Sequence, residues 1–229
     1  MNNPSKIIFS PADKQKTIAR YSKLFNRYSH SQKALGWGEK GKQELRFKVL
    51  VDYWNLKGMR ILDIGAGFGD LYQFLQPYKI KNYHGFELVR DLAQKGIELY
   101  GTNDNFKMSI GNFLEIELVE EYDIAFISGL FNFKLVNGNN DEFIRSVITK
   151  AFRQCRVGLA SNFITDRVDY EEELIFNSRP ETILEMGLAL TRNVLLRCDY
   201  FPFEFSLFLT KDDSFSKEDT IFNTYKNKK

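Results

Sequence analysis

Apolar side chains follow two different spacings along this chain, and the spacing changes near residue 59. Before that point, residues 14–29 and 41–55 place apolar side chains at helical spacing, as Leu50 and Trp54 do in the second segment. Residues 29–41, which are rich in glycine and serine, separate the two segments. The pattern therefore predicts two helices joined by a loop.

From residue 59 onward, short apolar runs alternate with amphipathic segments. Strands are predicted at residues 59–64, 82–87, 106–110, 122–128 and 157–163. Helices are predicted at residues 70–76, 88–100, 141–154 and 179–189. Two last strands, 193–200 and 203–210, meet at Phe201 and Pro202 and predict a hairpin. The alternation predicts an α/β fold with a mostly parallel, seven-stranded sheet between two helical layers, closed by a C-terminal antiparallel hairpin.

The same pattern divides the chain into three segments. We expect an N-terminal helical cap or lid over residues 1–57, the sheet domain over residues 58–210 and a polar tail over residues 211–229. Within the first segment, Pro4 and Pro11 are expected to break any helix. Residues 1–13 are therefore predicted to be a loosely packed lead.

Three glycines follow the first predicted strand at alternate positions. The stretch reads Asp63-Ile64-Gly65-Ala66-Gly67-Phe68-Gly69 and runs directly into a helix. Glycines permit a tight turn and let a ligand approach the main chain. A dinucleotide fingerprint needs Gly or Ala three residues after its second Gly, but that position is Asp70. The spacing therefore disfavours a nicotinamide dehydrogenase. The simpler alternative to a ligand-binding turn is a glycine-rich turn that binds nothing.

An acidic residue ends the next predicted strand. Glu87 lies 18 residues after Gly69 and is followed by Leu88. A carboxylate at this place accepts hydrogen bonds from both hydroxyls of a ribose. Two later turns add Asn112-Phe113, after the third strand, and Ser128, after the fourth. Together these stretches resemble the motifs of class I S-adenosylmethionine-dependent methyltransferases, over residues 59–210.

The resemblance implies a Rossmann-like three-layer fold and S-adenosyl-L-methionine as the cofactor. The glycine turn would face the methionine part, Glu87 the ribose, and Asn112 with Phe113 the adenine. The predicted cofactor-binding residues are Asp63, Gly65, Ala66, Gly67, Gly69, Glu87, Leu88, Asn112, Phe113 and Ser128.

The sequence contains fewer motifs for the binding site of the methyl acceptor than for that of the cofactor. Methyl transfer to oxygen benefits from a general base, and the chain has only two histidines. His84 lies inside a strand and is expected to be structural, whereas His30, near Tyr28, is the candidate base. A solvated loop histidine is the alternative for His30. The predicted substrate-binding residues, placed by topology, are Trp37, Asn132, Asn162, Arg167 and Tyr170, with a surface ion pair as the alternative for Arg167.

Composition narrows the classes of function. The net charge is only +2 and no long basic run occurs, which argues against a nucleic-acid partner. No apolar run has the roughly 18 residues that a membrane span needs. Cys155 and Cys198 form neither a disulfide framework nor a metal cluster, so we expect no metal and a cytoplasmic protein.

The sequence therefore predicts an S-adenosylmethionine-dependent methyltransferase that acts on a small polar acceptor. By analogy with the family, our first choice of acceptor is a hydroxyl of a sugar or of another cell-surface polysaccharide precursor. Two alternatives are a protein methyltransferase and a non-catalytic partner subunit that binds the cofactor. The sequence indicates no oligomeric state.

Overall fold

A seven-stranded mixed sheet forms the centre of the molecule in the computed structural model, which describes residues 8–36 and 42–226. The strands are β1 (Arg60–Ile64), β2 (Asn82–Glu87), β3 (Phe106–Ile110), β4 (Tyr122–Ile127), β5 (Cys155–Ile164), β6 (Asn193–Arg197) and β7 (Glu204–Thr210). Their order is β3-β2-β1-β4-β5-β7-β6. The first five strands are mutually parallel, whereas β7 is antiparallel to both β5 and β6. The predicted fold and its C-terminal hairpin are confirmed.

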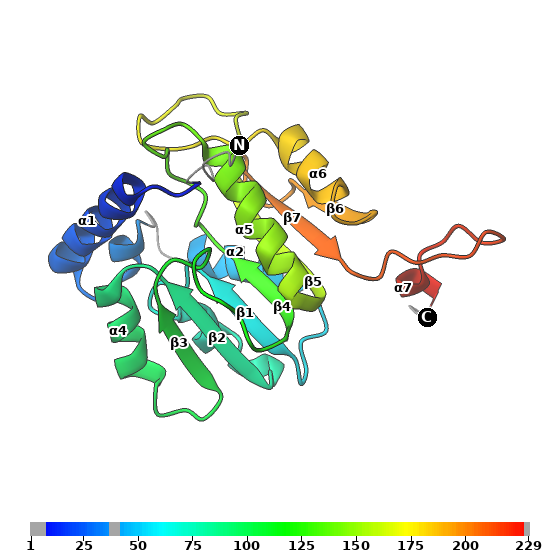
Figure 1. The fold of residues 1–229 in the computed structure, drawn as a ribbon, viewed down its shortest axis with the longest axis horizontal. Helices are drawn as coiled ribbons and strands as arrows, with labels where there is room; N and C mark the ends of the chain where they lie inside the picture. The colour runs from blue at the N-terminus through cyan, green and yellow to red at the C-terminus, as the bar shows by residue number, and fades with distance from the viewer. Residues whose placement is uncertain (1–7, 37–41, 227–229) are drawn as a thin grey trace, which may run out of the picture.

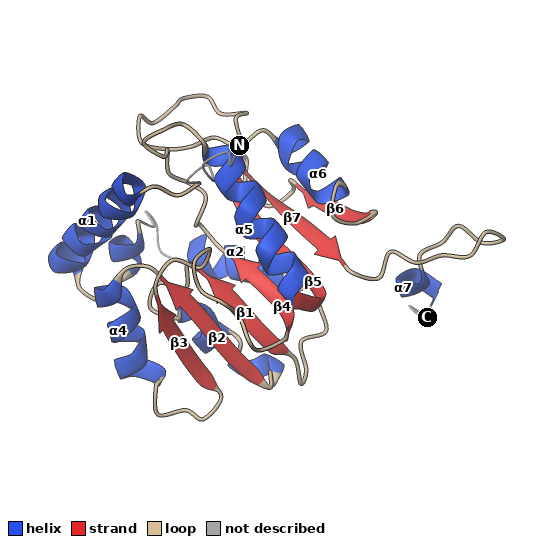
Figure 2. Cartoon of the chain, in the orientation of Figure 1, coloured by secondary structure: helices blue, strands red, loops and turns tan. Residues whose placement is uncertain are grey.

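Helices cover both faces of this sheet (Figures 1 and 2). The longer helices are α1 (Pro11–Tyr28), α2 (Lys42–Val51), α4 (Arg90–Tyr100), α5 (Asn140–Gln154) and α6 (Pro180–Leu188). Shorter turns are η1 (Gln32–Leu35), α3 (Asp70–Phe74), η2 (Gln76–Tyr78) and α7 (Asn223–Lys226). Helices α5 and α6 pack on one face, while α2 and α3 pack on the other. Helix α1 lies beyond the sheet, beside η1 and α4.

The central strands are buried on both faces, as expected for parallel strands between two helical layers. Every residue of β4 is buried, and Ile124, Phe126 and Ile127 have no measurable exposure. Aromatic rings fill the remaining volume: Phe163 of β5 stacks between Phe131 and Phe205. A rigid sheet of this kind fixes the positions of the loops at its carboxyl edge.

The predicted start of the first helix is wrong. Helix α1 begins at Pro11 rather than at residue 14, because proline suits the first helical turn. Ser10 and Asp13 form a reciprocal capping box, with Asp13 Oδ2 accepting from the Ser10 main-chain N–H at 3.0 Å. Phe9 and Asp13 are buried, and Asp13 Oδ1 accepts from the Val136 N–H. The part of the predicted loose lead that the structure describes is therefore packed.

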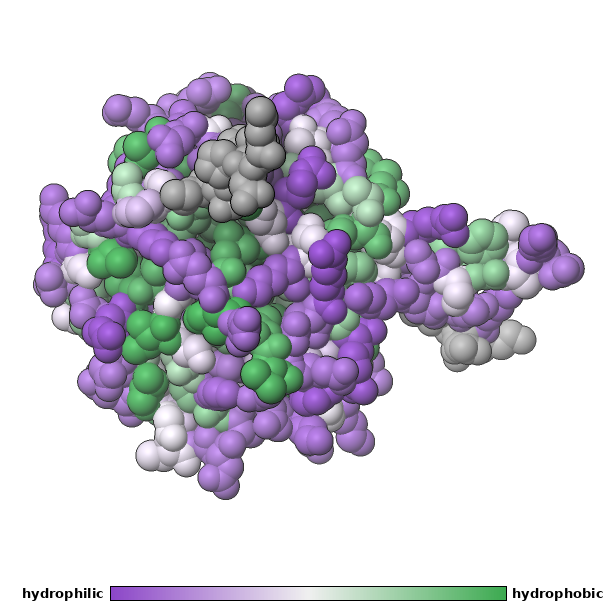
Figure 3. Space-filling model, viewed as in Figure 1, coloured by the Kyte–Doolittle hydropathy of each residue, from purple (hydrophilic) through white to green (hydrophobic). Residues whose placement is uncertain are grey.

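Two other predicted boundaries also shift. Helix α2 ends at Val51, so Trp54 lies beyond it and packs against Phe208. Strand β6 ends at Arg197 instead of residue 200. After β7, the chain projects from the body, and its last described element is α7; this lobe carries the exposed Phe215, Ile221 and Tyr225 among its polar residues (Figure 3). Among the described residues, no helix is long and apolar enough to cross a membrane.

Candidate functional site

The glycine turn leaves β1 in a conformation that side chains rarely adopt. Gly65 and Gly67 have φ values of +77° and +57°, in the left-handed region. The N–H groups of Gly65 and Ala66 both donate to the Phe86 carbonyl oxygen, at 2.9 and 3.1 Å, which ties the turn to the end of β2. A Cβ atom built on Gly67 would lie 2.9 Å from Leu35 Cδ2. The turn therefore presents bare main chain to a narrow space.

Glu87, the last residue of β2, lies beside this turn. Its Oε2 accepts from the Gly67 N–H at 2.8 Å and its Oε1 accepts from the Val89 N–H at 2.7 Å. Burial raises the pKa of Glu87 to about 7, although these backbone hydrogen bonds act in the opposite direction. Each carboxylate oxygen has two lone pairs, so each keeps capacity for one further donor.

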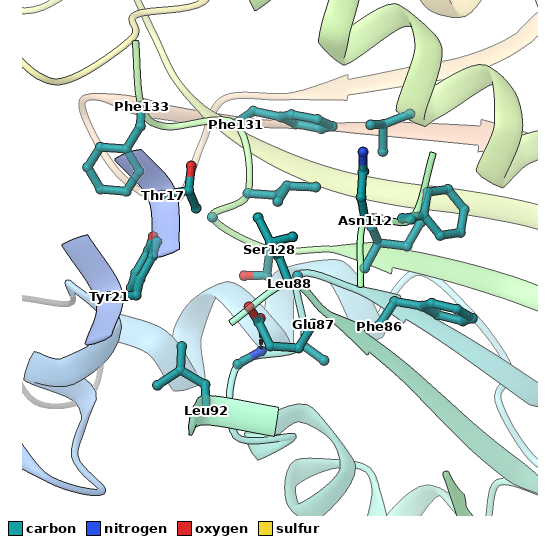
Figure 4. Close-up of a pocket in the computed structure, with 18 of the residues that line it drawn as sticks. Thr17, Tyr21, Phe86, Glu87, Leu88, Leu92, Asn112, Ser128, Phe131 and Phe133 are labelled. Carbon is teal, nitrogen blue, oxygen red and sulfur yellow. Dashed lines mark hydrogen bonds between the residues drawn. The ribbon is translucent and has the colours of Figure 1, made fainter. Parts of the chain in front are cut away.

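A cavity opens at the carboxyl ends of β1, β2, β3 and β4, and we name it the first cavity (Figure 4). Eight of the ten predicted cofactor-binding residues line it: Gly65, Ala66, Gly67, Glu87, Leu88, Asn112, Phe113 and Ser128. Thr17 and Tyr21 of α1 close its side opposite the sheet, as Figure 4 shows. Residues far apart in the sequence therefore meet where open α/β sheets bind ligands.

Asp63 and Gly69 do not line this cavity. Asp63 is buried, and its Oδ2 accepts from the Tyr83 hydroxyl at 2.6 Å. Burial raises the pKa of Asp63 to about 7. Gly69 has a positive φ and precedes the first residue of α3. The Gly69 N–H donates to the Ala66 carbonyl oxygen at 2.8 Å and so supports the glycine turn from outside the cavity, whereas the Asp63 side chain is held by Tyr83.

The turn after β3 forms the apolar end of the first cavity. Phe113 is buried and meets Phe86 edge to face, with ring centroids 5.6 Å apart. Asn112 Oδ1 accepts from the Leu114 N–H at 3.1 Å, which fixes the turn. Lys150 of α5 donates to the carbonyl oxygen of Phe113 at 2.7 Å. This end can hold a flat ring between apolar side chains.

A second cavity, of about 330 Å³, adjoins the first. The two share Tyr21, Leu35, Gly129 and Phe133 in their linings. Asn132 and Tyr170, both predicted substrate-binding residues, line the second cavity. Its charged lining residues are Arg20, Lys42, Arg46, Glu172 and Glu204. Arg46 and Glu204 form a two-pronged ion pair, with Arg46 Nε 2.7 Å from Glu204 Oε2.

The other predicted substrate-binding residues have different surroundings. Asn162 is buried behind the loop after β4, where its Oδ1 accepts from the Gly129 N–H at 2.9 Å and its Nδ2 donates to Ser128 Oγ at 3.3 Å. Arg167 is exposed and forms surface ion pairs with Asp166, at 3.7 Å, and with Glu181. The pair with Asp166 agrees with the surface alternative, whereas Glu181 was not an expected partner. Asn162 and Arg167 line neither cavity. Trp37 lies outside the described residues.

The predicted catalytic pair lies away from both cavities. His30 meets Phe68 edge to face, with ring centroids 4.8 Å apart, and its Nε2 is 3.7 Å from Asp70 Oδ1. Tyr28 packs beside η1, under the guanidinium of Arg27. Neither residue lines a cavity, so the geometry gives no support to a role in proton transfer.

His84 has a structural environment, as expected. Its Nδ1 lies 2.6 Å from the Tyr122 hydroxyl and its Nε2 lies 2.7 Å from Ser109 Oγ. Burial lowers the pKa of His84 to about 4. Within residues 8–36 and 42–226, no group of three or more His, Cys, Asp or Glu side chains is arranged to hold a metal ion.

Several lining residues were missed by sequence reasoning. Thr17 and Tyr21 lie one turn apart on α1 and face the first cavity, while Arg20 faces the second. Their spacing was visible in the sequence, because residues four apart share a helix face. The spacing alone did not show which face meets the sheet edge. Leu35 was missed because it was expected in a loop, whereas it lies in the short helix η1 beside the glycine turn.

Comparisons of the whole fold with solved structures identify its class. The magnesium protoporphyrin IX methyltransferase from Synechocystis PCC 6803 with bound SAM matches with a TM-score of 0.60 and 12% identity, covering 91% of this chain and 99% of that one. The CcbJ methyltransferase from Streptomyces caelestis matches with a TM-score of 0.61 and 12% identity, covering 83% and 98%. The fold is that of the class I methyltransferases.

A third structure of this methyltransferase fold points the same way. An S-adenosylmethionine-dependent methyltransferase from Clostridium acetobutylicum ATCC 824 has a TM-score of 0.57 and 12% identity, covering 83% of this chain and 98% of that one. No protein-family model and no curated protein sequence matches the chain. The methyltransferase fold is thus conserved in its backbone, while the side chains of the site must be judged on their own geometry.

Proposed function

We propose that this protein binds S-adenosyl-L-methionine in the first cavity and transfers its methyl group to a small polar acceptor in the second. One observation carries the proposal: the cavity that contains the glycine turn and Glu87 adjoins a second cavity through Tyr21, Leu35, Gly129 and Phe133. A methyl group at that junction would face both spaces. The solved structures with this fold, crystallised with SAM or SAH in several cases, agree with the same cofactor.

The residues of the first cavity suit the three parts of this cofactor. The free lone pairs of Glu87 can accept two hydrogen bonds from the ribose hydroxyls. Leu88 and Phe113 offer apolar contact to the adenine, beside Asn112. The methionine part would lie along Gly65 and Gly67, where no Cβ intrudes. When bound, the cofactor supplies an electrophilic methyl group on a positively charged sulfur.

The chain itself would contribute mainly by orienting the acceptor. Well-oriented reactants gain roughly 7–11 kcal/mol from positioning alone. Tyr21 lies at the junction, but burial and the nearby Glu87 raise its pKa well above the usual value of 10, so it stays protonated and acts as a hydrogen-bond donor. Asn162 accepts a hydrogen bond from the Gly129 N–H and donates one to Ser128 Oγ. These two bonds would fix the loop after β4 beneath the reacting atoms.

The finer part of the proposal concerns the acceptor. Structures with the same fold include enzymes named for a porphyrin substrate and for mycolic acid, so the fold accommodates very different acceptors. The second cavity of this chain is lined by side chains of both charges and by Asn132 and Asn177. These groups favour a small polar molecule, and we retain a sugar hydroxyl as the acceptor to be tested.

Calorimetry with S-adenosylmethionine and with S-adenosylhomocysteine tests the first step. We expect micromolar affinity, which corresponds to roughly −8 kcal/mol. A turnover assay with added acceptors then separates an enzyme from a non-catalytic cofactor-binding subunit. Absence of both binding heat and a thermal shift would overturn the proposed function.

Cofactor affinity is expected to fall in acid because Glu87 binds a proton. Its pKa is raised to about 7 in the free protein, and ribose hydroxyls donate stronger hydrogen bonds to the carboxylate than to the protonated acid. The bound state therefore has a lower pKa, binding releases a proton, and affinity is lost as pH falls through about 7. Between pH 8 and pH 6 the dissociation constant of S-adenosylhomocysteine should rise about tenfold.

The Glu87→Gln variant is the control for this pH profile. Asp63 also has a pKa raised to about 7, so a residual slope in Glu87→Gln would identify Asp63 as the titrating group. A flat wild-type profile would contradict the assignment of the ribose to Glu87.

Cofactor binding is also expected to protect the segment above the glycine turn. Leu35 of η1 lies directly over Gly67, and Tyr21 and Leu35 line both cavities. A ligand in the first cavity would contact Leu35 and add to the packing of this segment, so amide hydrogen exchange in residues 28–36 should slow. Peptides from β6 serve as the internal control. Equal exchange with and without S-adenosylhomocysteine would favour a rigid extension over a lid.

A further inference from the structure

We propose that the methyl acceptor carries an anionic group, a carboxylate or a phosphate, which Arg20 binds in the second cavity. This inference rests on the proposed function, because it names the chemical class of the molecule that occupies the acceptor space. It starts from Arg20 of α1, which lines the second cavity and was not singled out by the sequence.

The guanidinium of Arg20 has no acidic partner within the described part of the chain. Its Cζ lies 3.7 Å from the centre of the Phe133 ring, and the ring holds the group in place from one side. Its Nε is inaccessible to solvent and has no hydrogen-bond partner. No ligand atom can reach this buried Nε as it stands, so an anion would bind the remaining N–H groups of the guanidinium, which has no acidic partner among the described residues and lines the cavity.

The other arginine of this cavity has the acidic partner that Arg20 lacks within the described residues. Arg46 is paired with both carboxylate oxygens of Glu204. Arg167, outside the cavity, pairs with Glu181. Arg20 therefore differs from both, although all three have the planar fork that suits carboxylates and phosphates.

Asn132 supplies a second unmatched atom in the same cavity. Its side-chain Oδ1 is inaccessible to solvent and has no hydrogen-bond partner, while its main-chain oxygen accepts from the Phe176 N–H at 3.0 Å. The free Oδ1 suits a hydroxyl or amine donor. A donor group of the ligand could bond this Oδ1 once the Asn132 side chain turns toward the cavity that it lines.

The charge of the cavity agrees with an anionic ligand. Because Arg46 and Glu204 neutralise each other, the fixed positive charge nearest Phe133 is that of Arg20. The positive sulfur of a bound cofactor would add to this attraction.

A carboxylate could reach Arg20 from two sources, the acceptor or the methionine part of the cofactor itself. The first is our proposal, because Arg20 lines the second cavity and is absent from the lining of the first. The two sources differ in a measurable way. A cofactor carboxylate would make Arg20 important for cofactor affinity, whereas an acceptor anion would not.

The first experiment measures cofactor affinity in wild type and in Arg20→Met, which keeps an apolar stem over Phe133. S-adenosylhomocysteine and 5′-methylthioadenosine, which lacks the amino-acid part, are titrated by calorimetry. We expect both dissociation constants to change less than threefold. Selective loss of S-adenosylhomocysteine affinity would assign Arg20 to the cofactor and overturn the proposal. Failure of wild type to bind either ligand would instead overturn the proposed function.

The second experiment uses protein saturated with S-adenosylhomocysteine and two matched pairs of probes, glucuronate with glucose and 4-hydroxybenzoate with 4-hydroxybenzamide. At least one anion should bind about tenfold or more tightly than its neutral partner, and Arg20→Met should abolish the difference. Arg20→Lys should restore part of it, since the charge is retained but the fork is lost.

Arg27→Met is the matched control, because Arg27 also lies on α1 over an aromatic ring but lines neither cavity. It should bind all four probes as wild type does. Equal binding of anion and neutral probe in both pairs, or a preference that survives in Arg20→Met, would overturn the proposal.

Discussion

Replacing Gly67 by valine is expected to abolish binding of S-adenosylmethionine. Gly67 has a φ of +57°, and a Cβ there would already meet Leu35 at 2.9 Å. The two methyl groups of valine would collide with Leu35 and with any ligand that lies along the glycine turn in the first cavity, which both residues line. We expect calorimetry to detect no binding of S-adenosylhomocysteine by Gly67→Val at millimolar ligand. Its binding free energy would then be weaker than about −4.1 kcal/mol, the value for a millimolar dissociation constant.

Backbone strain must be separated from this loss of space. Gly58 has a φ of +73° and has nothing within 4 Å of a built Cβ, so Gly58→Val carries similar strain away from the cavity. This control should bind the ligand as wild type does. Gly67→Ala, with less bulk, should keep the fold and bind weakly. Wild-type affinity in a folded Gly67→Val protein would show that the glycine turn does not face the ligand.

The cofactor site could be predicted from the sequence because its requirements fall on residues close together in the chain. The alternating glycines lie within one turn, and the acid ends the next strand, so both can be recognised from their spacing. The structure places Gly65, Gly67 and Glu87 in the lining of one cavity. The sheet was predictable for a similar reason, since the five parallel strands, four of them largely buried, and the closing hairpin each leave a local hydrophobic pattern.

The acceptor side could not be predicted in the same way, because it depends on how α1 is oriented over the sheet. His30 was favoured as a base from its residue type and its position in a loop, but it packs against Phe68 outside the cavities. Arg20 looked like an ordinary helix-surface arginine. Its unmatched Nε becomes visible only once Phe133 from the loop after β4 lies beneath it.

Loss of the Glu87 carboxylate is expected to weaken cofactor binding by about 1.5–3 kcal/mol, the range for hydrogen bonds to a charged group. This corresponds to roughly a 10- to 100-fold higher dissociation constant. The effect has two physical sources. The ribose hydroxyls lose a charged acceptor. In addition, either the Gly67 N–H or the Val89 N–H loses its hydrogen bond to the side chain at position 87.

Glu87→Gln separates charge from shape, since glutamine has the same size but only one acceptor oxygen. Its amide NH₂ would face either the Gly67 or the Val89 N–H, so donor would meet donor. Glu98→Gln, on the exposed side of α4, is the matched control and should bind S-adenosylhomocysteine normally. If Glu87→Gln binds within twofold of wild type at pH 8, the ribose does not bind at Glu87. The first cavity would then have to hold the cofactor through its glycine turn and apolar end alone.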